Sequence, residues 1–119
     1  MTAAARSVNL FGWYLLVLGA TLLVAPNALL QAFTLPPTSE VWIRVVGMLV
    51  AFLGIYYRVA AAAGLVAIFR ASVAVRCSVV AFFAVFVGVG WAPWPLLLFG
   101  VFDVAGAAWT WLALRADGA

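Results

Sequence analysis

The stretch from Val41 to Ala63, VWIRVVGMLVAFLGIYYRVAAAA, decides the fold. It is long enough, at a helical rise of about 1.5 Å per residue, to cross a hydrocarbon core of about 30 Å. One face of this predicted helix carries small residues and arginines at helical spacing: Arg44, Gly47, Ala51, Gly54 and Arg58. Such a face allows close contact with a neighbouring helix and brings two cations to that contact.

The composition indicates that the rest of the chain also lies in the lipid bilayer. Of the 119 residues, 70% are hydrophobic and 8% are charged, and the mean hydropathy is +1.28. A soluble chain of this length leaves roughly a third of its surface in water, and this one has too few polar residues to cover that surface. The sequence therefore predicts an all-α polytopic membrane protein, with residues 1–119 forming a single domain.

Turn signals divide the chain into four apolar segments. Pro26 ends the first, Gly64 ends the second, and the breaker at residues 91–95, WAPWP, separates the third from the fourth. Residues 65–72 are too apolar for an aqueous loop and too few to span, so we interpret them as an interfacial turn. The predicted four-transmembrane-helix bundle has spans at residues 8–25, 41–63, 73–90 and 96–114.

The charges orient these spans. The connections at residues 26–40 and 91–95 contain neither Lys nor Arg. Five arginines lie toward the opposite side: Arg6, Arg58, Arg70, Arg76 and Arg115. By the positive-inside rule, both termini are then cytoplasmic. The tryptophans at the other side, Trp42, Trp91 and Trp94, mark the outer interface, and we expect the inner-interface anchors to be Tyr56, Tyr57, Arg58 and Arg70.

Asp103 is the only acid inside a predicted span. It lies about 10 Å below the outer end of its helix, and Arg44 lies about 4–5 Å below the same surface. These depths predict an Arg44–Asp103 pair, with Arg76 approaching from the other side to complete an intramembrane charge cluster.

The energetics of this pair leave two hypotheses open. An unpaired Asp costs roughly 2.5–3.5 kcal/mol. A pair at ~4 Å gains on the order of 4 kcal/mol before desolvation is subtracted. Because the pair roughly breaks even, it either fixes which helices meet or lines a cavity or permeation path.

Small residues recur on the predicted helix faces, where they let helices approach closely. The helix-packing residues that we expect are Gly12, Gly19, Gly47, Ala51, Gly54, Gly100, Gly106 and Ala107.

Catalytic and metal chemistry find little support. The chain has no histidine and one cysteine, Cys77, so we expect no metal site, no cofactor and no enzymatic activity. The net charge of +3 is explained by topology and lipid headgroups, and we expect no nucleic-acid partner.

Several short motifs carry a family resemblance. They are Arg44-Val-Val-Gly47, Gly54-Ile-Tyr-Tyr57, Arg76 in the third helix, and the lone acid in FGVFDVAGAAWTWLAL. In these motifs the chain resembles small bacterial four-helix membrane proteins of uncharacterised families, which in turn resemble the smaller DoxX-like proteins in having an Arg-x-x-Gly near the start of the second helix and a lone acid late in the chain. The resemblance implies a four-helix inner-membrane fold and no activity.

The sequence thus predicts a non-catalytic protein of the bacterial cytoplasmic (inner) membrane. Its partners are the lipid bilayer and either further copies of itself or a larger membrane complex. The first hypothesis for its role is an accessory or scaffold subunit, or a self-associating bundle. The alternative is a transporter or channel for a small solute, an anion or an amphiphile, with the charge cluster lining its cavity.

Overall fold

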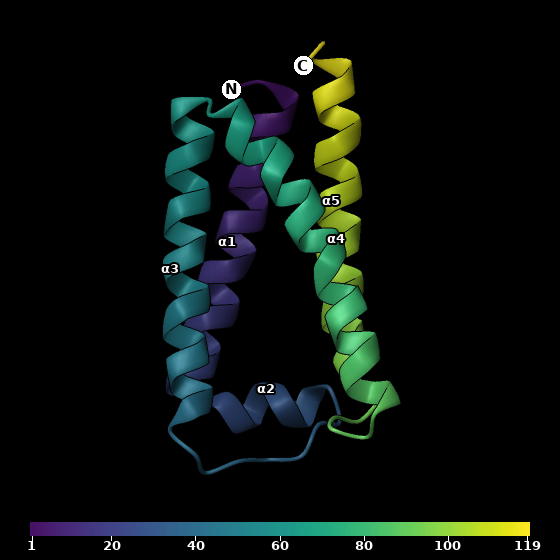
Figure 1. The fold of residues 1–119 in the computed structure, drawn as a ribbon. Coiled ribbons are helices and arrows are strands. Elements are labelled where there is room, and N and C mark those ends of the chain that lie inside the picture. Colours follow the sequence, from purple (N-terminus) through teal and green to yellow (C-terminus); the bar gives the residue numbers. More distant parts are fainter.

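The computed structural model describes all 119 residues and is all-helical (Figure 1). The helices are α1 (Ala3–Val24), α2 (Pro26–Ala32), α3 (Trp42–Ala63), α4 (Val66–Gly88) and α5 (Leu96–Ala116). Every helix except α2 is long and apolar enough to cross a membrane. The structure therefore agrees with the predicted all-α class and with the number of long apolar helices.

Local signals set most of the helix ends. The Thr2 hydroxyl caps α1 by accepting a hydrogen bond from the Ala5 amide at 3.1 Å. Pro26 occupies the first turn of α2, where its missing N–H costs nothing. Gly64 ends α3 in the left-handed conformation (φ 66°), and the Leu65 amide then bonds to the Ala60 carbonyl at 3.1 Å.

The predicted interfacial turn at residues 65–72 is wrong. The left-handed Gly64 reverses the chain by itself, so α4 begins at Val66, seven residues before the predicted start of the third span. The run that follows contains neither proline nor glycine to interrupt a helix. As a consequence Arg76 lies in the middle of α4 instead of one turn from its end. The first helix also starts early, at Ala3 instead of residue 8.

The long helices form two pairs. In one pair α1 packs along α3, in the other α4 packs along α5, and α1 also contacts α5, whereas α3 and α4 barely touch. Both chain termini lie at one end, where the pairs meet, and the pairs diverge toward the other end, which α2 crosses (Figure 1).

The buried core lies at the terminal end, where small side chains bring all four long helices together. Its members are Ala4, Ala5, Val8, Ala60, Ala61, Phe69, Ala113 and Leu114. The Asp117 carboxylate ties the two ends of the chain, because it accepts hydrogen bonds from the Ala3 amide (3.3 Å) and the Ala4 amide (2.9 Å). The bundle is therefore closed at one end and splayed at the other.

Candidate functional site

Four glycines hold α1 and α3 together. Gly12 faces Gly54, and a Cβ at residue 12 would lie 2.9 Å from the Gly54 carbonyl oxygen. Gly19 faces Gly47 and Ala51, where a Cβ would come within 2.4 Å of the Ala51 nitrogen. Since these neighbours are backbone atoms, no side chain fits between the two helices.

The small residues of α5 face helices α1 and α4. Gly100 faces Val80 of α4, and Ala107 is fully buried. Gly106 faces α1 and α4 together, because a Cβ there would lie 2.8 Å from the Phe11 ring and 3.2 Å from Nη1 of Arg76. All the small residues singled out in the sequence thus lie at contacts between helices within the chain.

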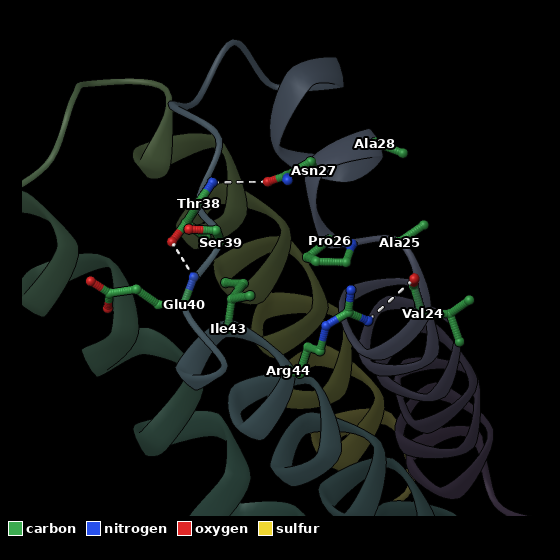
Figure 2. A pocket seen from close by; sticks show the side chains of 10 residues that line it. All are labelled: Val24, Ala25, Pro26, Asn27, Ala28, Thr38, Ser39, Glu40, Ile43 and Arg44. Atoms are coloured by element: carbon green, nitrogen blue, oxygen red, sulfur yellow. Dashed lines mark hydrogen bonds between the residues drawn. The ribbon is translucent and has the colours of Figure 1, made fainter.

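The structure does not bring Arg44 and Asp103 together. Arg44 is exposed at the α2 end, where its guanidinium donates hydrogen bonds to the carbonyl oxygens of Leu23 and Val24, the latter at 3.3 Å (Figure 2). These carbonyls end α1 and lack partners within that helix. Arg44 therefore caps a helix and lines a polar hollow of about 470 Å³ beside Glu40, separate from Asp103, and the predicted pair is corrected.

Arg76, not Arg44, is the arginine that lies at the centre of the bundle. It is only 2% exposed. Its Nε donates to the Ser72 carbonyl (3.2 Å), and its Nη2 donates to the hydroxyls of Ser72 (2.9 Å) and Thr110 (2.8 Å). Arg76 thereby joins the middle of α4 to α5.

The hydrogen-bond network of Arg76 continues into α1, and the donor and acceptor of each bond can be assigned. The Thr110 and Ser7 hydroxyls lie 2.8 Å apart, and the Ser7 hydroxyl donates to the Ala4 carbonyl at 2.7 Å. Because Ser7 gives its single proton to Ala4, Thr110 must donate to Ser7 and accept from Arg76. Every hydroxyl between Arg76 and α1 is therefore satisfied as both donor and acceptor.

One nitrogen of the Arg76 guanidinium takes no part in these hydrogen bonds. This nitrogen, Nη1, is buried and has no hydrogen-bond partner. The guanidinium carbon lies 4.6 Å from the Phe11 ring centroid and 5.9 Å from that of Tyr57, so aromatic faces stabilise the cation without accepting its N–H hydrogens in the plane.

Arg76 borders a cavity of about 340 Å³ between the two helix pairs. Of the 19 residues that line the cavity, 17 are hydrophobic, and the two exceptions are Arg76 and Asp103. Both walls carry exposed apolar side chains, such as Leu53 of α3 and Val75 of α4, so the space between these helices reaches the outer surface of the bundle. A site of this kind binds an apolar body and orients one polar group.

The predicted inner-interface anchors separate into two groups. Tyr56 and Arg70 are exposed, and Arg58 stacks on Trp13, with its guanidinium carbon 4.0 Å from the ring centroid. Tyr57 is half-buried and lines the cavity with Arg76 and Asp103, and its role as an anchor stays a prediction. Its neighbours at the contact are Phe11 and Arg76.

The hydrogen bonds of Arg76 to hydroxyl groups were not predicted from the sequence. Ser72 lies four residues before Arg76, a spacing that places both on one helix face. That signal is local and could have been used. Ser7 and Thr110 have no such signal, because their contact joins the first and last helices of the chain.

No group of three or more His, Cys, Asp or Glu side chains is placed to hold a metal ion, and Cys77 is exposed as a free thiol. Comparison of the chain with known protein families, curated proteins and solved structures finds no match. The resemblance to the smaller DoxX-like proteins therefore stays a prediction from the quoted motifs.

Proposed function

We propose that this chain is a non-catalytic integral protein of a bacterial cytoplasmic membrane that binds a small amphiphile between its two helix pairs. In this proposal the four long helices span the bilayer and both termini are cytoplasmic. The position of both termini at one end of the bundle supports an even number of spans (Figure 1). Arg6, Arg58, Arg70 and Arg115 belong to that end, which supports its cytoplasmic placement by the positive-inside rule.

The observation that carries the proposed binding function is an apolar cavity bordered by Arg76, a buried cation whose Nη1 has no hydrogen-bond partner. Arginine has five N–H donors, and the contacts to Ser72 and Thr110 use three of them. A buried donor without a partner costs about 1–3 kcal/mol. A ligand that brings an acceptor to Nη1 removes this cost and gains affinity from it.

The cavity also fits the proposed ligand in size and chemistry. Its volume of about 340 Å³ lies in the range of small-molecule sites, roughly 300–1,000 Å³. Its apolar walls would pack against a hydrocarbon body. Its two charged residues, Arg76 and Asp103, would bind one polar headgroup. The exposed apolar side chains at its edge, on α3 and α4, give a lipid-soluble molecule access from the bilayer.

The scaffold or self-association hypothesis has less support. It relied on small-residue faces that were free to contact another protein. Gly12, Gly19, Gly47 and Gly54 are already packed against one another within the chain, so they offer no free face to a partner helix.

Native mass spectrometry of the gently extracted protein tests the proposed function. Val79→Trp adds bulk to the cavity wall on α4, and Val85→Trp is the matched control, since Val85 lies on the same helix, is 57% exposed and is outside the cavity. We expect wild type and Val85→Trp to carry a bound amphiphile and Val79→Trp to lose it. Equal bound mass in all three proteins, or none in any of them, would contradict the proposal.

A further inference from the structure

Two opposite charges, Arg76 and Asp103, line the cavity without forming an ion pair. Arg76 directs its guanidinium toward Ser72 and Thr110, with which it makes all its hydrogen bonds. Asp103 is half-buried and lines the same cavity. Asp103 and Thr110 are seven residues apart on α5, which separates them by about 10 Å along the helix axis. The formal charge of the cavity wall is thus zero, and it is carried by one cation and one anion that form no ion pair.

A ligand in this cavity meets both charges. Both Arg76 and Asp103 line the cavity, and the guanidinium carries hydrogen-bond donors only whereas the carboxylate carries acceptors only. A carboxylate headgroup would suit Arg76 but would place like charges together at Asp103 in apolar surroundings. An ammonium headgroup would suit Asp103 and be repelled by Arg76 in the same way.

From this arrangement, and resting on the proposed function above, we propose that the ligand is an uncharged single-chain amphiphile whose head both accepts and donates hydrogen bonds. The head accepts from Arg76 and donates to Asp103, as a glycerol or another polyol group does. The Tyr14 and Tyr57 side chains also line the cavity.

The shape of the cavity places the chain of the ligand. From Arg76 and Asp103 the apolar walls continue toward the α2 end, where Leu22, Leu30 and Ile43 line the cavity. The volume of about 340 Å³ lies near the lower limit for small-molecule sites, so one hydrocarbon chain fits and the two chains of a phospholipid do not.

Photo-crosslinking in phosphatidylcholine nanodiscs tests the headgroup directly. Three probes carry the same chain with a terminal diazirine and differ only in the head: dodecanoyl glycerol, dodecanoate and dodecyltrimethylammonium. We expect dodecanoyl glycerol to label the cavity wall near Leu22 and Ile43 roughly tenfold more than either charged probe, a ratio equivalent to about 1.4 kcal/mol. Val79→Trp supplies the background for each probe.

Asp103→Asn provides a second, independent test. Asparagine keeps the size of the side chain and both donates and accepts, so dodecanoyl glycerol should still label the protein. Because the substitution leaves Arg76 as the only charge, labelling by dodecanoate should rise roughly tenfold while labelling by the cationic probe should not. If Asp103→Asn does not fold, the order of the three probes on the wild-type protein still decides the question.

The outcomes separate the two proposals. A wild-type preference for dodecanoate or for dodecyltrimethylammonium would overturn the inference about the headgroup and leave amphiphile binding intact. Unchanged dodecanoate labelling in folded Asp103→Asn would also overturn it. If no probe labels the cavity above the Val79→Trp background, amphiphile binding itself fails.

Discussion

The Arg76 guanidinium donates a hydrogen bond to the Thr110 hydroxyl at 2.8 Å, and this contact joins the middle of α4 to α5 inside the bundle. Thr110 passes the interaction on to Ser7 of α1. Three helices therefore meet at one buried cation, and the same cation borders the cavity to which we assign the ligand.

Thr110→Val tests this contact. Valine keeps the shape of threonine but removes the acceptor of Arg76 and the donor to Ser7, so buried polar groups lose their partners. We expect the free energy of unfolding in detergent to fall by about 1–3 kcal/mol. Thr21→Val is the control, because the Thr21 hydroxyl bonds only to the Val17 carbonyl of its own helix. Equal losses in the two variants would refute the assigned role of Thr110.

Gly19→Ala tests the contact between α1 and α3. The new methyl group would meet the Ala51 nitrogen at 2.4 Å and the Gly47 carbonyl oxygen at 2.6 Å, so the helices must move apart. Overpacking of this kind costs about 1–3 kcal/mol, measured as the loss in free energy of unfolding. Gly88→Ala should change stability by less than about 0.5 kcal/mol, since nothing lies within 4 Å of the added methyl group. A tolerated Gly19→Ala would contradict the packing.

Asp117→Ala tests the contact that ties the chain ends. Removing the carboxylate leaves the Ala3 and Ala4 amides without their side-chain acceptor. We expect a loss of about 0.5–2 kcal/mol, as for other helix caps, and faster hydrogen exchange in the first turn of α1. Arg115→Ala, in the last turn of α5, should leave that exchange unchanged. Identical exchange in wild type and Asp117→Ala would contradict the cap.

A double-mutant cycle tests the separation of Arg44 from Asp103. Arg44→Gln weakens the cap on α1, and Asp103→Asn changes the cavity wall, so the two substitutions share no partner. Their effects on unfolding free energy should add within about 0.5 kcal/mol. A larger coupling energy would show that the two residues interact and would contradict their separation.

The sequence predicted what depends on local signals. Pro26, Gly64 and the proline-rich breaker before Leu96 set helix ends close to the observed ones, since a proline or a left-handed glycine acts within one turn. The glycine faces of α1 and α3 were also evident from spacing, although the mutual pairing of Gly19 with Gly47 depends on how the helices meet.

The candidate site was predicted less well, for physical reasons. Placing the start of the third span at residue 73 left Arg76 near a helix end, where a long side chain can reach the interface. With α4 starting at Val66, Arg76 lies mid-helix and is buried. Arg44 was chosen as the partner of Asp103 from the similar depths of the two residues, and depth alone does not report which helix faces meet. The contacts of Ser7 and Asp117 join the two ends of the chain, and no local pattern reports them.

The side-chain NMR signals of Arg76 test the central claim most directly. In protein labelled with ¹⁵N-arginine and held in nanodiscs, adding dodecanoyl glycerol should shift and sharpen the Nη1 hydrogens of Arg76, because they gain a fixed acceptor and rotate less. The other five arginines should keep their signals, and Val79→Trp should abolish the response. An unchanged Arg76 signal in ligand-saturated wild-type protein would contradict the assignment of this residue as the anchor of the ligand.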